Sequence, residues 1–485
     1  MPCIFVLRQI KRLAEFFRQL YSLLNPSRYL PMKTTSRRQF LQTTATTTGA
    51  FALPRFSIGK PGESANSKIN VAVVGAGGMG GYAVREAAKQ NLVAFADVDD
   101  ARAAKAYKQH PDAARFRDFR EMLDKKGKEV DAVLISTPDH THFAAAMEAM
   151  QRGKHIFVQK PLAHNIWQIR TLQKAAHKYK VQTQMGNQGH TFDGMRRIKE
   201  WIDAGVVGDV REVITWTNRP CAPWFIAPKK FPLPKQNAPD TLDWKLWQGP
   251  VRHRGFSTEY VPTKWRSWWE YGCGSLGDIG CHTFDAPFHV LGLGSPMKVE
   301  IERLDPPGPG FIPMSSKVTY WFPKRGNKPP VKMVWYEAGY DVPKPERWDS
   351  KKALPSGGGM YMEGSKETLY HEGMRPTKPV ITPGPRMNDL KSKLDGIEKL
   401  PSLGNGPIDE LFNAIKGNIK AAGSNFDYAV PLTEVVLLGA MAQRTGKTIE
   451  WDPKNMKVKG HPEFDNLVRE PAHREFSYGE ELWKG

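Results

Sequence analysis

The chain has 485 residues, of which 40% are apolar and 11% aromatic, so it can form a large core in two or three domains and is not intrinsically disordered. Its formal charge is +20, but ten Lys or Arg residues and a single acid, Glu15, fall within residues 1–60. Because this positive charge gathers at one end and no nucleic-acid-binding motif accompanies it, the composition argues against binding to DNA or RNA.

The N-terminal segment carries Arg37 and Arg38 ahead of a mild Thr/Ala/Gly stretch, a pattern that resembles a twin-arginine export signal. Such a signal begins naturally at Met32, so translation starts either at Met1 or at Met32. We expect residues 1–60 to be an N-terminal extension with this signal, and the mature protein to be periplasmic or otherwise extracytoplasmic. No later apolar run is long enough to span a bilayer, so we expect no stable membrane insertion after signal cleavage.

A glycine-rich hexad at residues 75–80 directly follows the apolar run 69–74. The pattern G-x-G-x-x-G between a strand and a helix is typical of dinucleotide binding, because glycines allow a tight turn and a close approach to the pyrophosphate. The residues that we predict to bind the cofactor here are Gly75, Gly77, Gly78, Met79 and Gly80. A second apolar run ends in Asp97, 22 residues after Gly75, where a carboxylate binds the ribose hydroxyls and repels a 2′-phosphate. The predicted cofactor is therefore NAD, with NADP less favoured.

Apolar runs alternate with helical patterns between residues 68 and 187. The predicted strands are 69–74, 92–96, 132–136, 156–159 and 181–185. This alternation predicts an α/β protein whose first domain, residues 68–187, is a Rossmann domain with a doubly wound parallel sheet.

The sequence pattern changes beyond residue 208, where longer strand-like segments are separated by loops rich in Pro and Gly. The predicted strands are 210–217, 318–322 and 332–336, the predicted helices are 408–422 and 432–444, and the predicted surface loops are 340–358 and 373–406. We therefore expect a C-terminal α/β domain, residues 188–453, with a large open and mostly antiparallel sheet. The helices within 408–444 are expected to pack back on the Rossmann domain, and residues 454–485 to form a C-terminal tail.

Three cysteines lie beyond the signal segment, Cys221, Cys273 and Cys281. Their irregular spacing fits neither a disulfide framework nor a zinc site, so we predict three buried thiols.

Three further motifs follow the predicted strands or open a helix: Thr-Pro-Asp-His-Thr-His at 137–142, Val-Gln-Lys-Pro-Leu at 158–162 and Gly-Asp-Ile-Gly-Cys-His at 277–282. Together with the glycine hexad they resemble the Gfo/Idh/MocA family of oxidoreductases, over about residues 68–453. The resemblance implies transfer of hydride between NAD(P) and a carbon of a sugar or polyol. It also implies that the open sheet holds this carbohydrate substrate and forms the interface of a homo-oligomer, a dimer or a tetramer.

The resemblance also assigns roles to single residues. Lys160 matches the family lysine whose ammonium group binds the reacting hydroxyl near the nicotinamide, whereas Gln159 replaces the usual glutamate and removes a negative charge beside it. The further cofactor-binding residues that it implies are Thr137, Pro138, His142, Gln159, Lys160 and Asn187. We leave His140 outside the catalytic set, because a lone histidine in a loop is usually solvated.

Asp278 and His282 are four residues apart, which on a helix places both side chains on one face. We predict that His282 is the general base of an alcohol oxidation and that Asp278 orients it, so the predicted catalytic residues are Lys160, Asp278 and His282. N-terminal capping is the alternative role for Asp278. Asp285 and His289 extend the same stripe, but a helix spreads these four residues over about 16 Å, too far for one ion, so we predict no metal site.

Seven of the fourteen tryptophans fall between Trp216 and Trp269, interleaved with Lys and Arg. Indole rings stack on sugar rings and basic side chains bind hydroxyl groups, so this region is a predicted sugar platform, with core packing as the alternative. The predicted substrate-binding residues are Trp265, Arg266, Trp268 and Trp269.

An exported NAD enzyme lacks a replenished nucleotide pool, so we expect the cofactor to stay bound and to be recycled within one site. Two alternatives remain open from the sequence. One is an NAD-assisted, redox-neutral glycoside hydrolase, lyase or epimerase that works through a transient keto-sugar. The other is a non-catalytic sugar-binding protein that keeps the fold.

Overall fold

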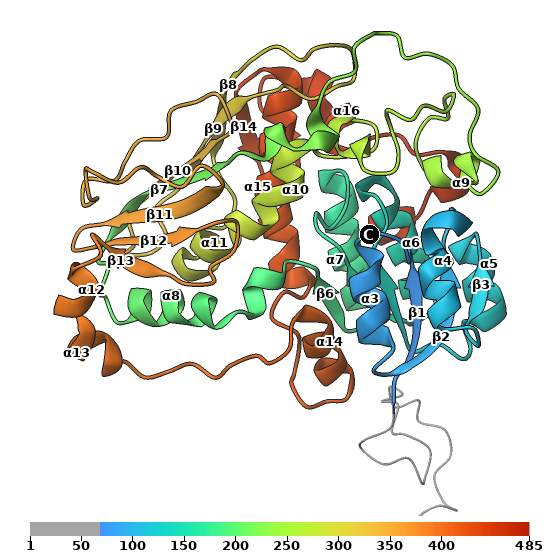
Figure 1. Ribbon diagram of the computed structural model, residues 1–485, viewed down its shortest axis with the longest axis horizontal. Coiled ribbons are helices and arrows are strands. Elements are labelled where there is room, and N and C mark those ends of the chain that lie inside the picture. Colours follow the sequence, from blue (N-terminus) through green and yellow to red (C-terminus); the bar gives the residue numbers. More distant parts are fainter. Residues whose placement is uncertain (1–67, 485) are drawn as a thin grey trace, which may run out of the picture. The chain divides into compact units, whose positions relative to one another are not determined.

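The computed structural model describes residues 68–484, so the predicted export signal lies outside the described residues (Figure 1). The strands of the first sheet are β1 (Asn70–Val74), β2 (Asn91–Ala96), β3 (Ala114–Phe116), β4 (Ala132–Ile135), β5 (His155–Val158) and β6 (Thr183–Met185). The helices between them are α3 (Gly80–Ala87), α4 (Asp100–Gln109), α5 (Phe119–Lys126), α6 (Asp139–Gln151) and α7 (Ile166–Tyr179). The strand order is β3-β2-β1-β4-β5-β6 and every neighbouring pair is parallel, which confirms the predicted Rossmann domain.

Strand β1 shows why both faces of this sheet must be covered. Val71 and Val73 belong to one buried cluster, and the alternating residues Ala72 and Val74 belong to another. Successive side chains of a strand point to opposite faces, so a continuous apolar strand needs helices on both sides. Helix α14 (Pro407–Ile415) contributes Ile408 to the first of these clusters and thus packs on the Rossmann domain.

The second sheet contains nine of the described strands, in the order β13-β12-β11-β7-β10-β9-β8-β14-β15. These strands are β7 (Val210–Thr217), β8 (Lys298–Arg303), β9 (Ser316–Phe322), β10 (Val331–Tyr336), β11 (Gly358–Gly364), β12 (Thr368–Glu372), β13 (Val380–Thr382), β14 (Ile449–Asp452) and β15 (Lys457–Val458). Only the pair of β7 and β10 is parallel among its described strand pairs, so the predicted open and mostly antiparallel sheet is confirmed.

The remaining helices connect and cover these sheets. They are α8 (Asp193–Asp203), α9 (Trp244–Gln248), α10 (Gly274–Thr283), α11 (Asp285–Leu291), α12 (Arg386–Asp389), α13 (Lys391–Asp395), α15 (Phe426–Thr445) and α16 (Asp465–Val468). Helix α14 ends at Ile415, whereas the sequence predicts a helix to residue 422, because Gly417 follows with φ of +75°. Helix α15 begins at Phe426, six residues before its predicted start, and includes Pro431.

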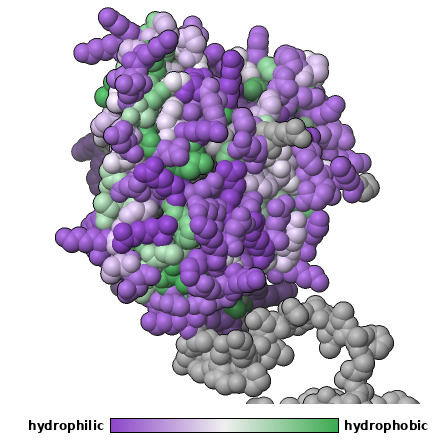
Figure 2. Space-filling model, turned by 90° about the vertical axis from the view of Figure 1, so that its right-hand side faces the viewer, coloured by the Kyte–Doolittle hydropathy of each residue, from purple (hydrophilic) through white to green (hydrophobic). Residues whose placement is uncertain are grey.

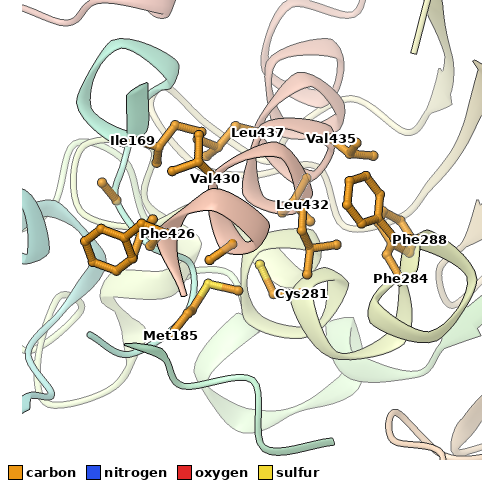
Figure 3. Close-up of a cluster of buried hydrophobic side chains, with 14 of the residues drawn as sticks. Ile169, Met185, Cys281, Phe284, Phe288, Phe426, Val430, Leu432, Val435 and Leu437 are labelled. Carbon is orange, nitrogen blue, oxygen red and sulfur yellow. The ribbon is translucent and has the colours of Figure 1, made fainter. Parts of the chain in front are cut away.

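Helix α15 lies between the two sheets and contacts α7, α10, β6 and β8 (Figure 1). Figure 3 shows its apolar side chains among Ile169 of α7, Met185 of β6 and Cys281 of α10. One continuous core therefore joins the Rossmann domain to the C-terminal domain. Because Cys281 of α10 points into this core, the next residue, His282, is free to face another side of the helix.

The C-terminal strap, residues 462–484, returns to the Rossmann domain (Figure 1). Trp483 stacks on Trp167 of α7 with ring centroids 6.2 Å apart, and its indole Nε1 donates a hydrogen bond to Thr171 Oγ1 at 3.0 Å. The guanidinium of Arg469 lies over the other indole, 4.5 Å from the Trp167 ring centroid. The end of the described chain is thus packed against α7.

The three cysteines of the described residues differ in exposure. Cys273 and Cys281 are buried, but Cys221 is exposed at the end of the short turn η2 (Arg219–Cys221), so the prediction of three buried thiols is wrong for Cys221.

Polar residues cover most of the face shown in Figure 2, with apolar residues in small patches. Among the described helices, none combines the length and apolarity needed to cross a membrane.

Replacing Gly439 of α15 with alanine is expected to destabilise the protein. Alanine has the higher helix propensity by about 1 kcal/mol. However, a Cβ at this position would overlap the hydroxyl oxygen of Tyr320 and lie 2.5 Å from Leu276 Cδ2, both in the core between α15 and the second sheet. Overpacking costs about 1–3 kcal/mol, so Gly439→Ala should lower the Tm in scanning calorimetry. Gly255→Ala, where a Cβ would meet open space, is the control. An unchanged or higher Tm for Gly439→Ala would contradict this packing.

Candidate active site

A cavity of about 560 Å³ lies where the carboxyl ends of β1, β2, β4 and β5 face the C-terminal domain. Four residues of the glycine hexad, Gly75, Gly77, Gly78 and Met79, line one end, whereas Gly80 does not belong to the lining. Asp278 and His282 of α10 line the other end. Ligands of open α/β sheets bind at the carboxyl ends of the strands, where neighbouring loops diverge. The cavity is therefore in the position, and within the size range, of a ligand site.

The glycine hexad forms the turn between β1 and α3. Gly75 has φ of +82°, and a Cβ on it would lie 2.8 Å from the carbonyl oxygen of Ser136 in the neighbouring loop. A Cβ on Gly80 would overlap the carbonyl oxygen of Gly75. Both positions thus require glycine, for conformation at the first and for close packing at the second. Met79, on the rim of the cavity, is 56% exposed.

Asp97 lies at the end of β2 beside this turn. Its Oδ2 accepts hydrogen bonds from the backbone N–H groups of Ala76, at 2.8 Å, and Gly77, at 3.2 Å. Burial raises the pKa of Asp97, although these hydrogen bonds oppose the shift. Asp97 thus holds the glycine turn in shape while it lines the cavity. Arg102 also lines the cavity and packs against Gly77 and Gly78, a contact that the sequence pattern does not reveal.

Lys160 and Asp278 meet at the opposite end of the cavity. The ammonium Nζ of Lys160 donates to the backbone oxygen of Asp278 at 2.5 Å and to its carboxylate Oδ1 at 3.0 Å. Arg266 Nε lies 3.3 Å from Oδ1, and Arg219 Nε lies 3.3 Å from Oδ2. Burial alone would raise the pKa of Asp278, but Lys160, Arg266 and Arg219 together hold it well below its ordinary value. The negative charge beside Lys160 is therefore supplied by Asp278, not by residue 159.

His282 lies one turn after Asp278 and is only 3% exposed. No hydrogen bond joins the side chains of these two described residues, so the predicted direct orientation of His282 by Asp278 is not formed; Asp278 binds cations instead. The Nε2 atom of His282 lies 3.4 Å from Nη2 of Arg375, and its Nδ1 has no partner among the described residues. Burial, followed by the charges of Lys160 and Arg375, holds the pKa of His282 well below its ordinary value. Its imidazole is therefore neutral at neutral pH.

Several buried polar atoms around the cavity lack a partner within residues 68–484. They include Ser136 Oγ, Thr137 Oγ1, Gln159 Nε2 and His282 Nδ1, all from residues that line the cavity. An unpaired buried polar group is costly, so such a group near a cavity indicates a ligand that satisfies it. Together with the glycine turn, this set of donors and acceptors fits a dinucleotide with its pyrophosphate at the start of α3 and its polar ring amide near these side chains.

Other sequence-predicted cofactor residues have different positions. Pro138 lines the cavity, but Asn187 and His142 do not belong to its lining. Asn187 is fully buried with both amide atoms unpartnered among the described residues. The ring nitrogens of His142 lie 2.8 Å from the backbone oxygens of Pro161 and Thr137, so this side chain bridges the loops that follow β5 and β4. His142 thus connects the two loops, and its predicted contact with a cofactor stays a prediction.

The tryptophan-rich segment only partly reaches the cavity. Trp265 and Arg266 line it, with the guanidinium of Arg266 4.1 Å from the Trp265 ring centroid. Trp268 and Trp269 are buried in an aromatic cluster that also contains Trp265, but they do not line the cavity, so both contribute to core packing. The lining also includes residues that no sequence pattern indicated, among them Gln188, Arg219, Trp224, Met374 and Arg375.

Asp285 and His289, which continue the helical spacing of Asp278 and His282, belong to a different cluster of side chains. Asp285 accepts a hydrogen bond from Tyr428 Oη at 2.5 Å and lies 3.0 Å from His190 Nδ1. His289 packs edge-on against His190, with ring centroids 5.1 Å apart. In the part of the chain that the structure describes, no group of three or more His, Cys, Asp or Glu residues is arranged to hold a metal ion.

Two family models match the chain. The NAD-binding Rossmann domain of an oxidoreductase family matches residues 69–187, and the C-terminal alpha/beta domain of the same family matches residues 191–320. The first domain is thus an NAD-binding domain. A solved WlbA dehydrogenase from Bordetella pertussis, in complex with NADH and UDP-GlcNAcA, matches with a TM-score of 0.55 and 16% identity, over 79% of this chain and 99% of that one. At this identity the match shows the fold alone.

Curated relatives match over shorter stretches of the chain. The rhizopine catabolism protein MocA of Rhizobium meliloti is 31% identical over 163 residues, which are 33% of this chain and 51% of that protein. Inositol 2-dehydrogenase 1 of Saccharopolyspora erythraea is 32% identical over 153 residues, 29% of this chain and 43% of that protein. The chain therefore spans about half the length of these relatives.

The buried side chain of His140, in the motif at residues 137–142, predicts that the folded protein loses stability in acid. Both ring nitrogens of His140 face backbone oxygens, of Tyr271 at 3.2 Å and Trp247 at 2.9 Å, and burial lowers its pKa to about 3. As the pH falls below about 6.5, the unfolded chain binds a proton here that the folded chain does not, so folding loses about 1.4 kcal/mol per pH unit. His140→Asn should remove this part of the pH slope in urea titrations.

Because the shorter asparagine side chain would lose contacts, the His140→Asn variant is expected to be less stable at neutral pH, but the slope between about pH 6 and pH 4 is the decisive quantity. His177→Asn, at an exposed position on α7, is the matched control. An unchanged slope in His140→Asn would contradict the neutral state of this buried ring.

Proposed function

Because the chain belongs to the Gfo/Idh/MocA oxidoreductase family, we propose that it oxidises an alcohol carbon of a sugar, sugar derivative or polyol. The observation that carries the proposal is that Lys160 and His282, from different domains, line one cavity with the glycine turn. Bound NAD supplies the hydride acceptor. The protein supplies the groups that hold the alcohol and take its proton.

Lys160 is suited to hold the reacting hydroxyl. An ammonium group has three N–H donors, and the two contacts to Asp278 use two of them. The remaining donor is available to an oxygen atom in the cavity. Because Asp278 is itself fixed by Arg219 and Arg266, the ammonium group keeps one position. A positive charge at this position stabilises the negative charge that develops on the substrate oxygen as its proton leaves.

His282 is suited to receive that proton. A general base must carry a lone pair at the working pH, and the neutral imidazole of His282 does so. Its low pKa would make a lasting imidazolium unfavourable. However, the carboxylate of Asp278, one helical turn away, raises the pKa of His282 and so stabilises the protonated ring. The charge of Asp278 therefore stabilises the protonated form of His282, and its direct contact with Lys160 holds the ammonium group in place.

The proposal includes export and retention of the nucleotide. Its support is the Arg37-Arg38 pair in a segment that precedes the described residues, together with a cavity that the C-terminal domain covers on one side. Outside the cytoplasm free NAD is not replenished. The protein therefore keeps its nucleotide through turnover, and the hydride returns within the same site to a second carbonyl compound or to the oxidised intermediate.

Replacing Lys160 tests the chemical role. Lys160→Met keeps a long side chain but removes the charge and the donors, so oxidation should slow by about 100-fold to 10,000-fold while the nucleotide remains bound. The measurement is the near-ultraviolet absorbance of NADH after sugars or polyols are added to the protein in single-turnover mode. Lys154→Met, at the residue just before β5 and outside the cavity lining, is the matched control. Equal rates for Lys160→Met and wild type would refute the proposed function.

Retention is tested on the purified protein. After extensive dialysis the protein should release about one NAD or NADH per chain on acid denaturation, measured by chromatography of the supernatant. A fully active protein that emerges from dialysis without nucleotide would show that the cofactor exchanges freely, and would end the recycling part of the proposal.

A further inference from the structure

Four cationic side chains surround the end of the cavity that holds His282. They are Lys160 after β5, Arg219 in the turn η2, Arg266 in the turn η4 (Lys264–Ser267), and Arg375 in the loop after β12. They come from four separate parts of the chain. No local sequence pattern groups them, and only the fold brings them together.

The negative charges at this end do not balance these four. Asp278 binds three of the cations, Lys160, Arg219 and Arg266. The other buried acid in the lining, Asp139, accepts a hydrogen bond from the backbone N–H of Cys273, and burial raises its pKa. This end of the cavity therefore carries a net positive charge within the described residues.

Arg375 has no acidic partner among the described residues. Its Nη2 donates to Gln188 Oε1 at 3.1 Å and lies 3.4 Å from His282 Nε2, and its Nε is buried without a partner. Burial, and then the nearby charge of Arg219, lower the pKa of Arg375. A guanidinium group nonetheless stays protonated in proteins, so Arg375 brings an uncompensated charge to the cavity.

The loop that carries Arg375 packs closely against the chain that precedes and begins α8. A Cβ on Gly194, at the start of α8, would overlap the backbone oxygen of Pro376, and a Cβ on Gly189 would lie 3.4 Å from Arg375 Cβ. The two glycines therefore let the loop lie directly on the chain between β6 and α8. This packing turns the guanidinium toward the cavity, although the sequence predicts residues 373–406 to be a surface loop.

Two of the other guanidinium groups are held by indole rings. Arg219 lies 5.3 Å from the ring centroid of Trp224, and Arg266 lies 4.1 Å from that of Trp265. Both tryptophans also line the cavity. Stacking fixes the plane of a guanidinium group and leaves its N–H edge available, so little order has to be imposed when an anion binds.

We infer that the substrate carries an anionic group, a carboxylate or an ester sulfate or phosphate, which Arg375 binds with support from Arg219. The inference rests on the proposed function and names the substrate class for the same site. Arg375 suits this role because the guanidinium fork matches carboxylate and phosphate oxygens. The pyrophosphate of the dinucleotide is expected at the glycine turn, at the other end of the cavity, and does not need this charge.

Because Arg375 lies beside His282, the anion binds close to the reacting hydroxyl. It then neutralises part of the positive charge that holds down the pKa of His282, which makes the imidazole a stronger base once the substrate is bound. A neutral sugar gives neither the ionic contact nor this effect.

The test uses pairs of compounds that differ in charge: glucuronate with glucose, gluconate with sorbitol, and a hexose sulfate and phosphate with the free hexose. The holoprotein is assayed by NADH absorbance, and binding is measured independently by calorimetry. At least one anionic compound should exceed its neutral counterpart by about 10-fold or more in kcat/KM and in affinity. The active members of the panel identify the anion as carboxylate, sulfate or phosphate.

Arg375→Gln should lower kcat/KM and affinity for the preferred anionic compound by about 30-fold or more, so that most of its advantage over its neutral counterpart is lost. Arg375→Lys should restore part of the loss, because it restores the charge without the fork. Arg211→Gln, at an exposed residue near the start of β7, is the matched control. Nucleotide content and Tm of all variants establish that they are folded and loaded.

The outcomes separate this inference from the proposed function. Oxidation of neutral sugars at rates equal to those of their acids would overturn the inference and leave the proposed function standing. Binding of an anionic sugar that needs Arg375, with no oxidation of any compound, would overturn the proposed function and leave the anion site standing. Loss of bound nucleotide from Arg375→Gln would assign the guanidinium to the cofactor and would also overturn the inference.

Discussion

The carboxylate of Asp278 is the interaction on which the arrangement of the cavity depends. It joins Lys160 from the Rossmann domain to Arg219 and Arg266 from two loops of the C-terminal domain. Removing this carboxylate would leave three cations without their counter-charge, and an uncompensated buried charge costs about 3–5 kcal/mol in measured cases. The same contact that assembles the two domains therefore also fixes the ammonium group proposed to bind the substrate.

This cluster also determines the state of the neighbouring base. Positive charges gathered by one carboxylate act on His282 over a short distance in a buried region, where electrostatic effects are strong. Burial is the largest cause that keeps the ring unprotonated; these charges add to it, while Asp278 opposes them. His282 can reach the cavity because consecutive residues of α10 face different surroundings. Cys281 points into the apolar core, and His282 points into the cavity.

Local patterns in the sequence predict much of the fold and one half of the site. The glycine hexad, Asp97 and the strand Val210–Thr217 are recognisable because short-range geometry alone requires their residues. The other half could not be predicted, because it is built from distant contacts. Arg375 lies 93 residues from His282 in a segment whose Pro and Gly content indicates a surface loop. Helical spacing correctly put Asp278 and His282 on one helix, but competition from three cations decided which partner Asp278 binds.

The C-terminal strap has a consequence for the order in which the protein matures. The outer face of α7, with Trp167 and Thr171, is complete only after Trp483 has docked on it. A chain emerging from the ribosome presents this nucleotide-binding half long before Trp483 is made. Until then this face of α7 stays open to solvent, so the first domain gains its final packing from a residue synthesised 312 positions after Thr171.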